Sequence, residues 1–234
     1  MTDDSELEGL DPFDLLDGEA ARLDSHFAAL PEAGWSRPSR CAGWSTREVL
    51  AHLLSSEDYN RACLDGQVRA FLGDLGARGA TDLDSANALG VAELAGVGTG
   101  EMLDRWRQAN AENRRGFRER GDGVIDSTVG EYPCRWQAFH LASELATHAD
   151  DIGVPVRAEE SGQRRAWRAR FSRFALAEAK PDVVVRRTDA LTSVSGEGVD
   201  VEVDDDQLVE GVAARLDDSS RVPPAARALL STMG

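Results

Sequence analysis

The stretch His140-Leu-Ala-Ser-Glu144-Leu-Ala-Thr-His148 carries three metal-capable side chains at intervals of four residues. Positions four apart on an α-helix differ by about 40° around its axis, so the three side chains point in roughly the same direction. Imidazole and carboxylate groups are ordinary ligands of zinc and other transition metals. The spacing leaves open whether His140 pairs with Glu144 or Glu144 pairs with His148. A pair of this kind is also common as a surface ion pair.

Apolar residues on both sides of this stripe indicate that its helix is buried on neighbouring faces: Phe139, Leu141 and Leu145. A buried carboxylate and imidazole need a compensating partner or a metal. The helix is predicted over residues 134–152, and Gly153 and Pro155 end it.

Three further amphipathic helices are predicted upstream. The first, residues 11–30, starts at Asp11-Pro12, where Asp can cap and Pro suits the first helical position. The second runs over residues 45–65 from the capping box Ser45-Thr-Arg-Glu48. The third spans residues 100–119. His52 lies on the second turn of the 45–65 helix among apolar residues. A histidine from a facing helix would complete three protein ligands and leave a fourth position for water or substrate.

The chain is predicted to be mainly α, with a four-helix bundle over residues 1–155 and a small α+β region over 156–234. Residues 66–98, rich in Gly, Ala and Asp, are predicted to be mainly a long connection with room for one short helix. The C-terminal region begins with a fifth helix over 163–180. Strands near 182–187 and 199–203 and short helices over 207–216 and 224–232 follow.

Charge and composition exclude several classes of function. With 26 basic and 42 acidic residues the net charge is -16, so nucleic acid and anionic membranes are not expected as partners. No targeting segment and no apolar run of the roughly 18 residues that a membrane helix needs is visible, so the chain is expected to be cytoplasmic. The three cysteines lack a C-x-x-C spacing, which argues against a disulfide framework or a thiolate zinc site.

The pattern Cys41-x-Gly43-Trp44-Ser-x-Arg47-x-Val-Leu-x-His52-Leu resembles the second-helix signature of the DinB-like superfamily. It is most similar to the mycothiol-dependent maleylpyruvate isomerase branch, whose later Glu-x-x-x-His-x-x-Asp is matched by Glu144-Leu-Ala-Thr-His148-Ala-Asp-Asp151. The resemblance covers about residues 10–155. It implies a divalent metal, usually zinc, held by His52, Glu144 and His148. His140 would then line the pocket, with a role in catalysis, and Asp151 would orient His148 from outside the ligand set or lie at the surface as a helix-end acid.

The same resemblance implies that a low-molecular-weight thiol, mycothiol in actinobacteria, is activated by the metal. The thiol would attack a small electrophilic substrate in S-transfer or in cis–trans isomerisation. Two alternatives remain open. One is a metal-dependent hydrolase or lyase that uses metal-bound water, with His140 as base. The other is a non-catalytic metal-binding bundle in which His140 is a fourth ligand. The sequence does not distinguish a monomer from a homodimer.

Overall fold

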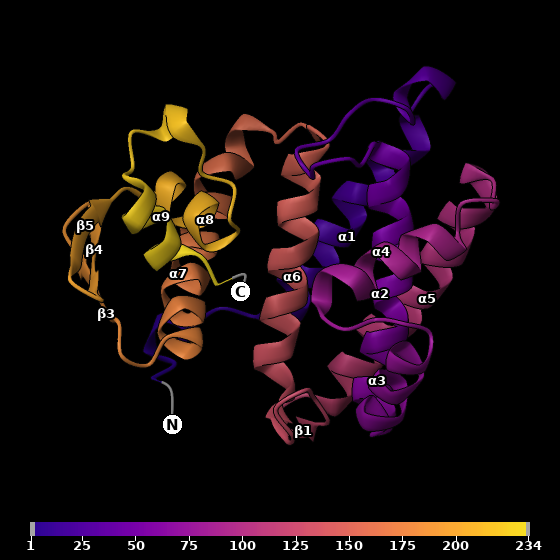
Figure 1. The fold of residues 1–234 in the computed structure, drawn as a ribbon, viewed down its shortest axis with the longest axis horizontal. Coiled ribbons are helices and arrows are strands. Elements are labelled where there is room, and N and C mark those ends of the chain that lie inside the picture. Colours follow the sequence, from indigo (N-terminus) through magenta and orange to yellow (C-terminus); the bar gives the residue numbers. More distant parts are fainter. Residues whose placement is uncertain (1–2, 233–234) are drawn as a thin grey trace. The chain divides into compact units, whose positions relative to one another are not determined.

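The computed structural model describes residues 3–232, and helices make up most of them, which confirms the mainly α class (Figure 1). The chain divides into two compact units. One unit spans Asp11–Val154, and the other combines the segment up to Leu10 with the residues from Pro155 onward. Within residues 3–232, every helix is too short or too polar to cross a bilayer.

Four long helices form the core of the Asp11–Val154 unit: α1 (Pro12–Ala29), α2 (Thr46–Asp65), α5 (Thr99–Arg120) and α6 (Cys134–Asp151). In Figure 1, α1 packs along α6, and α2 packs along α5. Aromatic side chains fill the space between them. The Phe27 ring stacks on Trp35 with centroids 5.6 Å apart and meets the edge of Trp106 at 5.9 Å. Because such large side chains are buried together, this cluster ties α1 and α5 into one hydrophobic core.

The predicted helix starts are confirmed by their capping contacts. The Asp11 side chain accepts hydrogen bonds from the backbone N–H groups of Phe13 and Asp14 at the start of α1. Ser45 and Glu48 form the predicted capping box at the start of α2. These contacts satisfy N–H groups that the first helical turn leaves without partners. The cap at Ser45 therefore sets where α2 begins and which residues face inward.

The segment 66–98 is more ordered than predicted. It forms two helices, α3 (Val68–Ala77) and α4 (Leu83–Glu93), instead of a long connection with one short helix. Val68 is the one buried residue of α3, and α4 has none. The helix α4 lacks an apolar stripe, whereas α3 has one, which the prediction overlooked in this Gly- and Ala-rich segment, at Val68, Phe71, Leu72 and Leu75. A short antiparallel pair, β1 (Val124–Ile125) with β2 (Tyr132–Pro133), leads into α6.

The second unit contains three α-helices and a three-stranded antiparallel sheet within its described residues. Its elements are α7 (Ala158–Ala179), β3 (Val184–Thr188), β4 (Leu191–Gly196), β5 (Val199–Val203), α8 (Asp205–Val212) and α9 (Pro224–Leu230). The strand order is β3-β4-β5. The sequence predicted two of these strands and missed β4. Glu197 and Gly198, both with positive φ, form the tight turn between β4 and β5, a geometry that suits the twist of a hairpin.

The N-terminal segment differs from the prediction, which placed it with the bundle. Its short 3-10 helix, Ser5–Leu7, packs on α7. The Arg170 guanidinium donates to the backbone oxygens of Glu6 and Glu8, both at 2.6 Å. Arg173, which is 3% exposed, pairs with the Glu6 carboxylate at 2.9 Å. These contacts hold residues 3–10 in the unit that contains α7.

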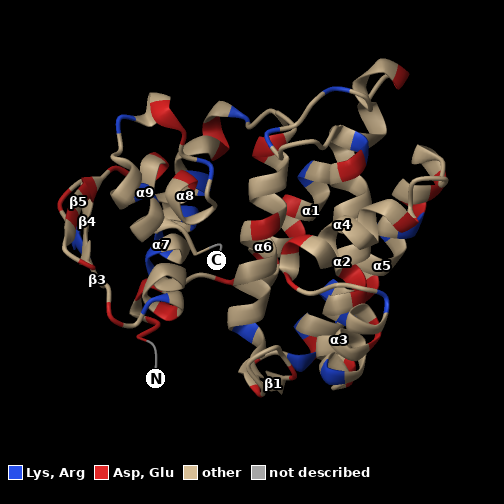
Figure 2. Cartoon of the chain, viewed as in Figure 1, with Lys and Arg blue, Asp and Glu red and all other residues tan. Residues whose placement is uncertain are grey.

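Acidic and basic residues alternate over the helices of the bundle (Figure 2). Arg118 on α5, for example, pairs with Asp14 and Asp17 on α1 at 2.9 and 2.7 Å. Each such exposed pair contributes about 0–1 kcal/mol. Such exposed pairs therefore contribute little to the stability of the bundle.

Candidate metal centre

The segment before α2 positions His52. Gly43 has a φ of +79°, a left-handed conformation that glycine adopts without strain. The backbone N–H of Ser39 then donates to the oxygen of Trp44 at 2.9 Å, which closes the loop. The helix starts at the Ser45 cap, and His52 follows on its second turn. The Trp44 ring lies against the imidazole of His52, with centroids 5.1 Å apart. The Gly-Trp-Ser motif therefore fixes both the position of His52 and its apolar cover.

His52, Glu144 and His148 meet between α2 and α6. The Nε2 atom of His52 lies 3.2 Å from Oε1 of Glu144. The His52 and His148 rings are edge to face at 4.8 Å between centroids. The three potential ligand atoms all lie within 4.8 Å of one another. Both histidines are buried, whereas the Glu144 side chain is 35% exposed. The cluster thus has one side that solvent or a small molecule can approach.

Asp151 accepts a hydrogen bond from Nδ1 of the His148 imidazole. The Nδ1–Oδ2 distance is 3.1 Å, and the Asp151 side chain is fully buried. The proton on Nδ1 leaves the lone pair of Nε2 available to a metal. The Cys41 thiol also donates to Oδ2 of Asp151, at 3.1 Å. Cys41, Asp151 and His148 form a second group with metal-ligand spacing.

The sequence did not single out Cys41 as part of the site. Gly43 and Trp44, which follow it, mark a loop in the sequence. No spacing links Cys41 to Asp151, which lies 110 residues away. The one sequence feature that points to Cys41 is its position at the start of the motif that leads to His52. In the structure the backbone N–H of Arg40 also donates to the oxygen of Asp151 at 3.0 Å. The loop is therefore tied to the end of α6 by both main chain and side chain.

Two imidazoles and a carboxylate form a donor set that a divalent metal such as zinc accepts. Zinc–ligand bonds of 2.0–2.1 Å at tetrahedral angles place neighbouring ligand atoms about 3.3 Å apart. The His52–Glu144 separation of 3.2 Å is close to that value. The Nδ1 atom of His52 is buried and has no hydrogen-bond partner among residues 3–232. Nδ1 of His52 therefore has no carboxylate partner among these residues, whereas Nδ1 of His148 is paired with Asp151.

The charge state of Glu144 is set by opposing effects. Burial alone raises the pKa of the Glu144 carboxyl group, but the hydrogen bond from His52 and the charges of His52 and His148 outweigh it. The pKa of Glu144 consequently lies below its ordinary value, and the group is an anion at neutral pH. An ionised carboxylate is the form that binds a cation.

His140 lies apart from these groups. Its Nε2 atom is 3.1 Å from the hydroxyl of Tyr132, the residue of β2 that precedes Pro133. The two rings are 6.1 Å apart between centroids. Neither group with metal-ligand spacing in residues 3–232 includes His140. The three residues of the predicted stripe therefore fall into two groups. His140 contacts Tyr132, whereas Glu144 and His148 belong to the cluster with His52.

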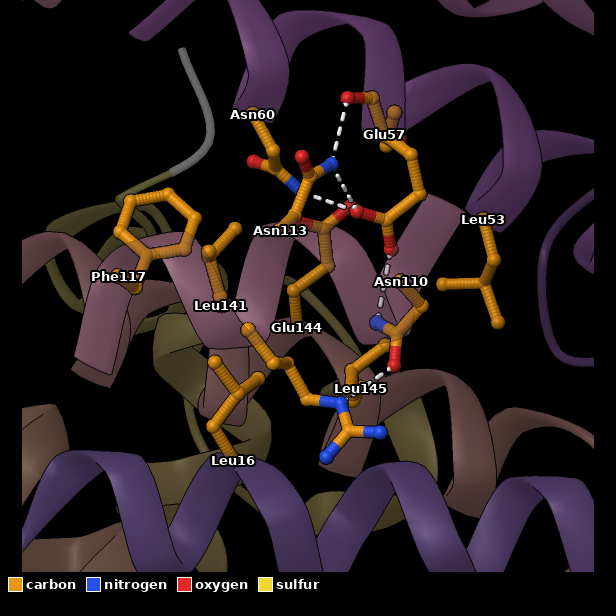
Figure 3. Close-up of a pocket in the computed structure, with 12 residues that line it drawn as sticks. Leu16, Leu53, Glu57, Asn60, Asn110, Asn113, Phe117, Leu141, Glu144 and Leu145 are labelled. Atoms are coloured by element: carbon orange, nitrogen blue, oxygen red, sulfur yellow. Dashed lines mark hydrogen bonds between the residues drawn. The ribbon is translucent and has the colours of Figure 1, made fainter. Parts of the chain in front are cut away.

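A small pocket of about 20 Å³, partly open to solvent, adjoins Glu144 (Figure 3). One wall is apolar and includes Leu53, Leu141 and Leu145. The other wall is polar and includes Glu57, Asn60 and Asn113. His140 is not among the residues that line it. The pocket has room for about one water molecule beside Glu144.

The site and the bundle together define a helical protein with a histidine–carboxylate centre. Residues 16–153 match the mycothiol maleylpyruvate isomerase N-terminal domain family, and the chain belongs to this family. The fold also resembles a crystal structure of the mycothiol-dependent maleylpyruvate isomerase, with a TM-score of 0.64 and 13% identity over 91% of this chain and 93% of that one.

A structure of a histidine-to-alanine mutant of the mycothiol-dependent maleylpyruvate isomerase is similar as well. Its TM-score is 0.51 at 12% identity, over 72% of this chain and 68% of that one. At such identities the two likenesses show the shared fold. No curated protein matches the chain in sequence.

Proposed function

We propose that the chain is a metal-dependent enzyme that uses a low-molecular-weight thiol, mycothiol, to isomerise or modify a small electrophilic substrate. The observation that carries this proposal is the convergence of His52, Glu144 and His148, with Asp151 leaving Nε2 of His148 available. Membership of the mycothiol maleylpyruvate isomerase family supports mycothiol as the thiol and isomerisation as the reaction class. Zinc is the metal that the donor set favours.

The protein groups have separate tasks in this proposal. His52, Glu144 and His148 hold the ion, which when bound makes a coordinating thiol acidic enough to lose its proton at neutral pH. Asp151 holds the proton on Nδ1 of His148 and keeps the ring oriented. Leu53, Leu141 and Leu145 supply an apolar surface beside Glu144 against which the substrate can pack. No side-chain nucleophile is required, because the thiol fills that role.

The reaction then follows from thiol chemistry. The sulfur adds to an activated double bond, and the electron pair moves to the neighbouring carbonyl. Rotation about the new single bond and return of the electron pair expel the same thiol and give the trans isomer. In S-transfer, a proton or the departure of a leaving group completes the first step, and the sulfur stays on the product. Isomerisation thus returns the thiol, whereas transfer consumes it.

The alternative of a hydrolase or lyase with His140 as base has weaker support. A general base must lie within hydrogen-bond reach of the water it activates. His140 is instead engaged with Tyr132 and is absent from the lining of the pocket beside Glu144.

The metal site is tested by measuring zinc per chain in the purified protein and in single variants. His52→Ala and His148→Ala should each lose most of the metal, while His26→Ala, on α1 and outside both groups, should retain it. Circular dichroism checks that each variant is folded. Full metal content in both site variants would remove the proposed centre.

The thiol requirement is tested with maleylpyruvate as a first substrate and with mycothiol present or absent. The proposal expects turnover only with thiol, and counting free thiol before and after separates isomerisation from transfer. Undiminished turnover without thiol would instead support chemistry by metal-bound water.

A further inference from the structure

Asp151 holds a carboxylate in a place where it needs hydrogen-bond donors. Its side chain has no exposed surface, and it is the last residue of α6. The C-terminal end of a helix carries a partial negative charge, and burial removes the solvation of a carboxylate. The donors that surround Asp151 therefore decide whether its carboxylate is tolerated there and which way it faces.

Two donors meet at one oxygen of this carboxylate. Nδ1 of His148 and Sγ of Cys41 both lie 3.1 Å from Oδ2 of Asp151. A thiol is a weak donor, but a hydrogen bond to a carboxylate is shorter and stronger than one to a neutral acceptor. The imidazole belongs to the same helix, whereas the thiol comes from the loop before α2. Cys41 therefore ties the carboxylate to a second element of the bundle.

The fold of the loop places the thiol. The backbone N–H of Arg40 donates to the oxygen of Asp151 at 3.0 Å, one of the carbonyls that a helix end leaves unpaired. The backbone N–H of Cys41 donates to Oγ of Ser39 at 3.1 Å, and that hydroxyl donates to the oxygen of Trp44 at 2.8 Å. Two consecutive loop residues thus engage Asp151, one at its main chain and one at its side chain. The thiol is directed at Oδ2 by the main chain that carries it.

We propose that Cys41 is a positioning residue of the metal centre, which acts on His148 through Asp151. The thiol holds the carboxylate with Oδ2 toward Nδ1 of His148. The carboxylate in turn holds the proton on Nδ1 and leaves Nε2 available to the ion. The inference rests on the proposed function for the identity of what Nε2 binds. In this role Cys41 touches neither the ion nor the substrate.

The spacing of Cys41, His148 and Asp151 also suits an ion of their own. The contacts favour the positioning role. Oδ2 of Asp151 lies at hydrogen-bond distance from both donors, whereas Sγ of Cys41 is 3.8 Å from Nδ1 of His148. An ion bound among the three would displace the protons of both hydrogen bonds and would take Nδ1 from the carboxylate that orients it. Ligation by Cys41 is therefore the rival that the experiments must separate from positioning.

Zinc affinity tests the positioning role, by competition with a chelator in wild type, Cys41→Ala and Cys41→Ser. Loss of an outer partner of a metal ligand typically costs 10–100-fold in affinity. Cys41 acts one bond further out through a weak donor, so Cys41→Ala should weaken zinc binding about three- to tenfold. Cys41→Ser keeps a hydroxyl donor and should recover most of the loss. Wild-type affinity in Cys41→Ala, or an equal loss in both variants, would overturn the proposal.

A double-mutant cycle shows whether the thiol acts through Asp151 or through the stability of the loop. In an Asp151→Asn background, Cys41→Ala should cause almost no further loss of zinc affinity, because the carboxylate that it positions is gone. In an Asp150→Asn background, at the neighbouring position of the same helix, Cys41→Ala should cost as much as in the wild type. Equal costs in the two backgrounds would contradict the proposal. Circular dichroism checks that every variant is folded.

Cobalt substitution separates positioning from ligation. A thiolate bound to cobalt gives an intense charge-transfer band in the near ultraviolet. The positioning role expects no such band in the cobalt-loaded wild type or in Cys41→Ala. A band in the wild type that Cys41→Ala lacks would make Cys41 a ligand and would refute the positioning role.

Metal-free protein separates failure of this inference from failure of the proposed function. The nitrogen NMR shifts of the His148 ring, recorded in mildly alkaline buffer, report which nitrogen carries the proton. The wild type should hold it on Nδ1, and Cys41→Ala should show a larger share on Nε2 or faster exchange of the Nδ1 proton. Such a difference supports the role of Cys41 even if zinc does not bind. Identical proton positions and exchange rates in the two proteins would overturn it even if zinc does bind.

Discussion

Asp151 lies 3.1 Å from Nδ1 of His148 through its Oδ2 atom, with no exposed side-chain surface. The contact spans one turn at the end of α6 and assigns the proton of the imidazole to Nδ1. His52 has no equivalent support, since its Nδ1 atom is unpaired among the described residues. The two histidines therefore differ in their support at Nδ1, while Nε2 of His52 lies 3.2 Å from Oε1 of Glu144.

Asp151→Asn should weaken metal binding without removing a ligand. The amide can present N–H to Nδ1 and stabilise the wrong tautomer, and loss of such an outer acceptor typically costs 10–100-fold in metal affinity. Competition with a zinc chelator measures the dissociation constant. Asp150→Asn, at the preceding and less buried position of the same helix, is the matched control and should bind as the wild type does. Equal affinities of the two variants would show that Asp151 does not orient His148.

Cys41 should be the one readily modified thiol of the chain. It is partly exposed, whereas Cys63 and Cys134 are buried. Burial raises the pKa of Cys63 to about 11 and that of Cys134 to about 11. Both thiols are then almost wholly protonated at pH 8, and the thiolate is the reactive form. Titration with a disulfide reagent in native buffer should count one fast thiol, and Cys41→Ser should count none. Fast modification of Cys63 or Cys134 would contradict this expectation.

The long helices could be predicted because their signals are local. Asp11 and the Ser45–Glu48 box lie next to the helices they cap, and apolar residues repeat along each inner face. Helix α4 buries none of its residues, so its sequence has no apolar stripe from which the helix could be predicted. Strand β4 was missed because Thr192, which is fully buried, gave a polar signal within a strand whose inner face is otherwise apolar.

The candidate site shows the same division between local and distant signals. Spacing gave the stripe of Glu144 and His148, and the resemblance joined His52 to it. Contacts between residues far apart in sequence, such as Cys41 with Asp151 or Glu57 with Asn110, have no signature in a single chain. The sequence nevertheless contains one indication that Asn110 has a buried partner. Asn110 and Asn113 stand at positions of the apolar stripe of α5, where an amide must find a buried partner.

Glu57 should make the stability of the bundle depend on pH. Burial raises the pKa of its carboxyl, and Glu144 adds to the rise, while hydrogen bonds from the asparagines oppose it. Between the ordinary pKa of glutamate, about 4.3, and the higher folded-state pKa, the folded chain binds more protons than the unfolded one. The free energy of unfolding therefore falls as pH rises through that window.

Glu57→Gln removes this dependence, so the wild type should lose stability relative to the variant as pH increases. Urea denaturation of the metal-free proteins from pH 4 to 8 measures the difference. Glu112→Gln, at an exposed pair with Arg61, controls for the loss of one carboxylate elsewhere. A difference between wild type and Glu57→Gln that stays constant over the range would contradict the raised pKa.

Arg47 should hold the end of α4 in place. Its guanidinium donates to the backbone oxygens of Leu94, Ala95 and Val97 at 2.8, 2.9 and 2.8 Å. These carbonyls follow the last turn of α4, where a helix leaves acceptors unpaired. These bonds add to the packing of α4 on α2, where Gly90 lies close against Ser55. Arg47→Leu should raise amide hydrogen exchange over residues 83–97 by about tenfold or more, at about 0.5–1.5 kcal/mol for each lost bond.

Arg61→Leu, on the exposed side of the same helix, should leave exchange in that segment unchanged. Equal exchange in the two variants would mean that α4 is held by contacts other than Arg47.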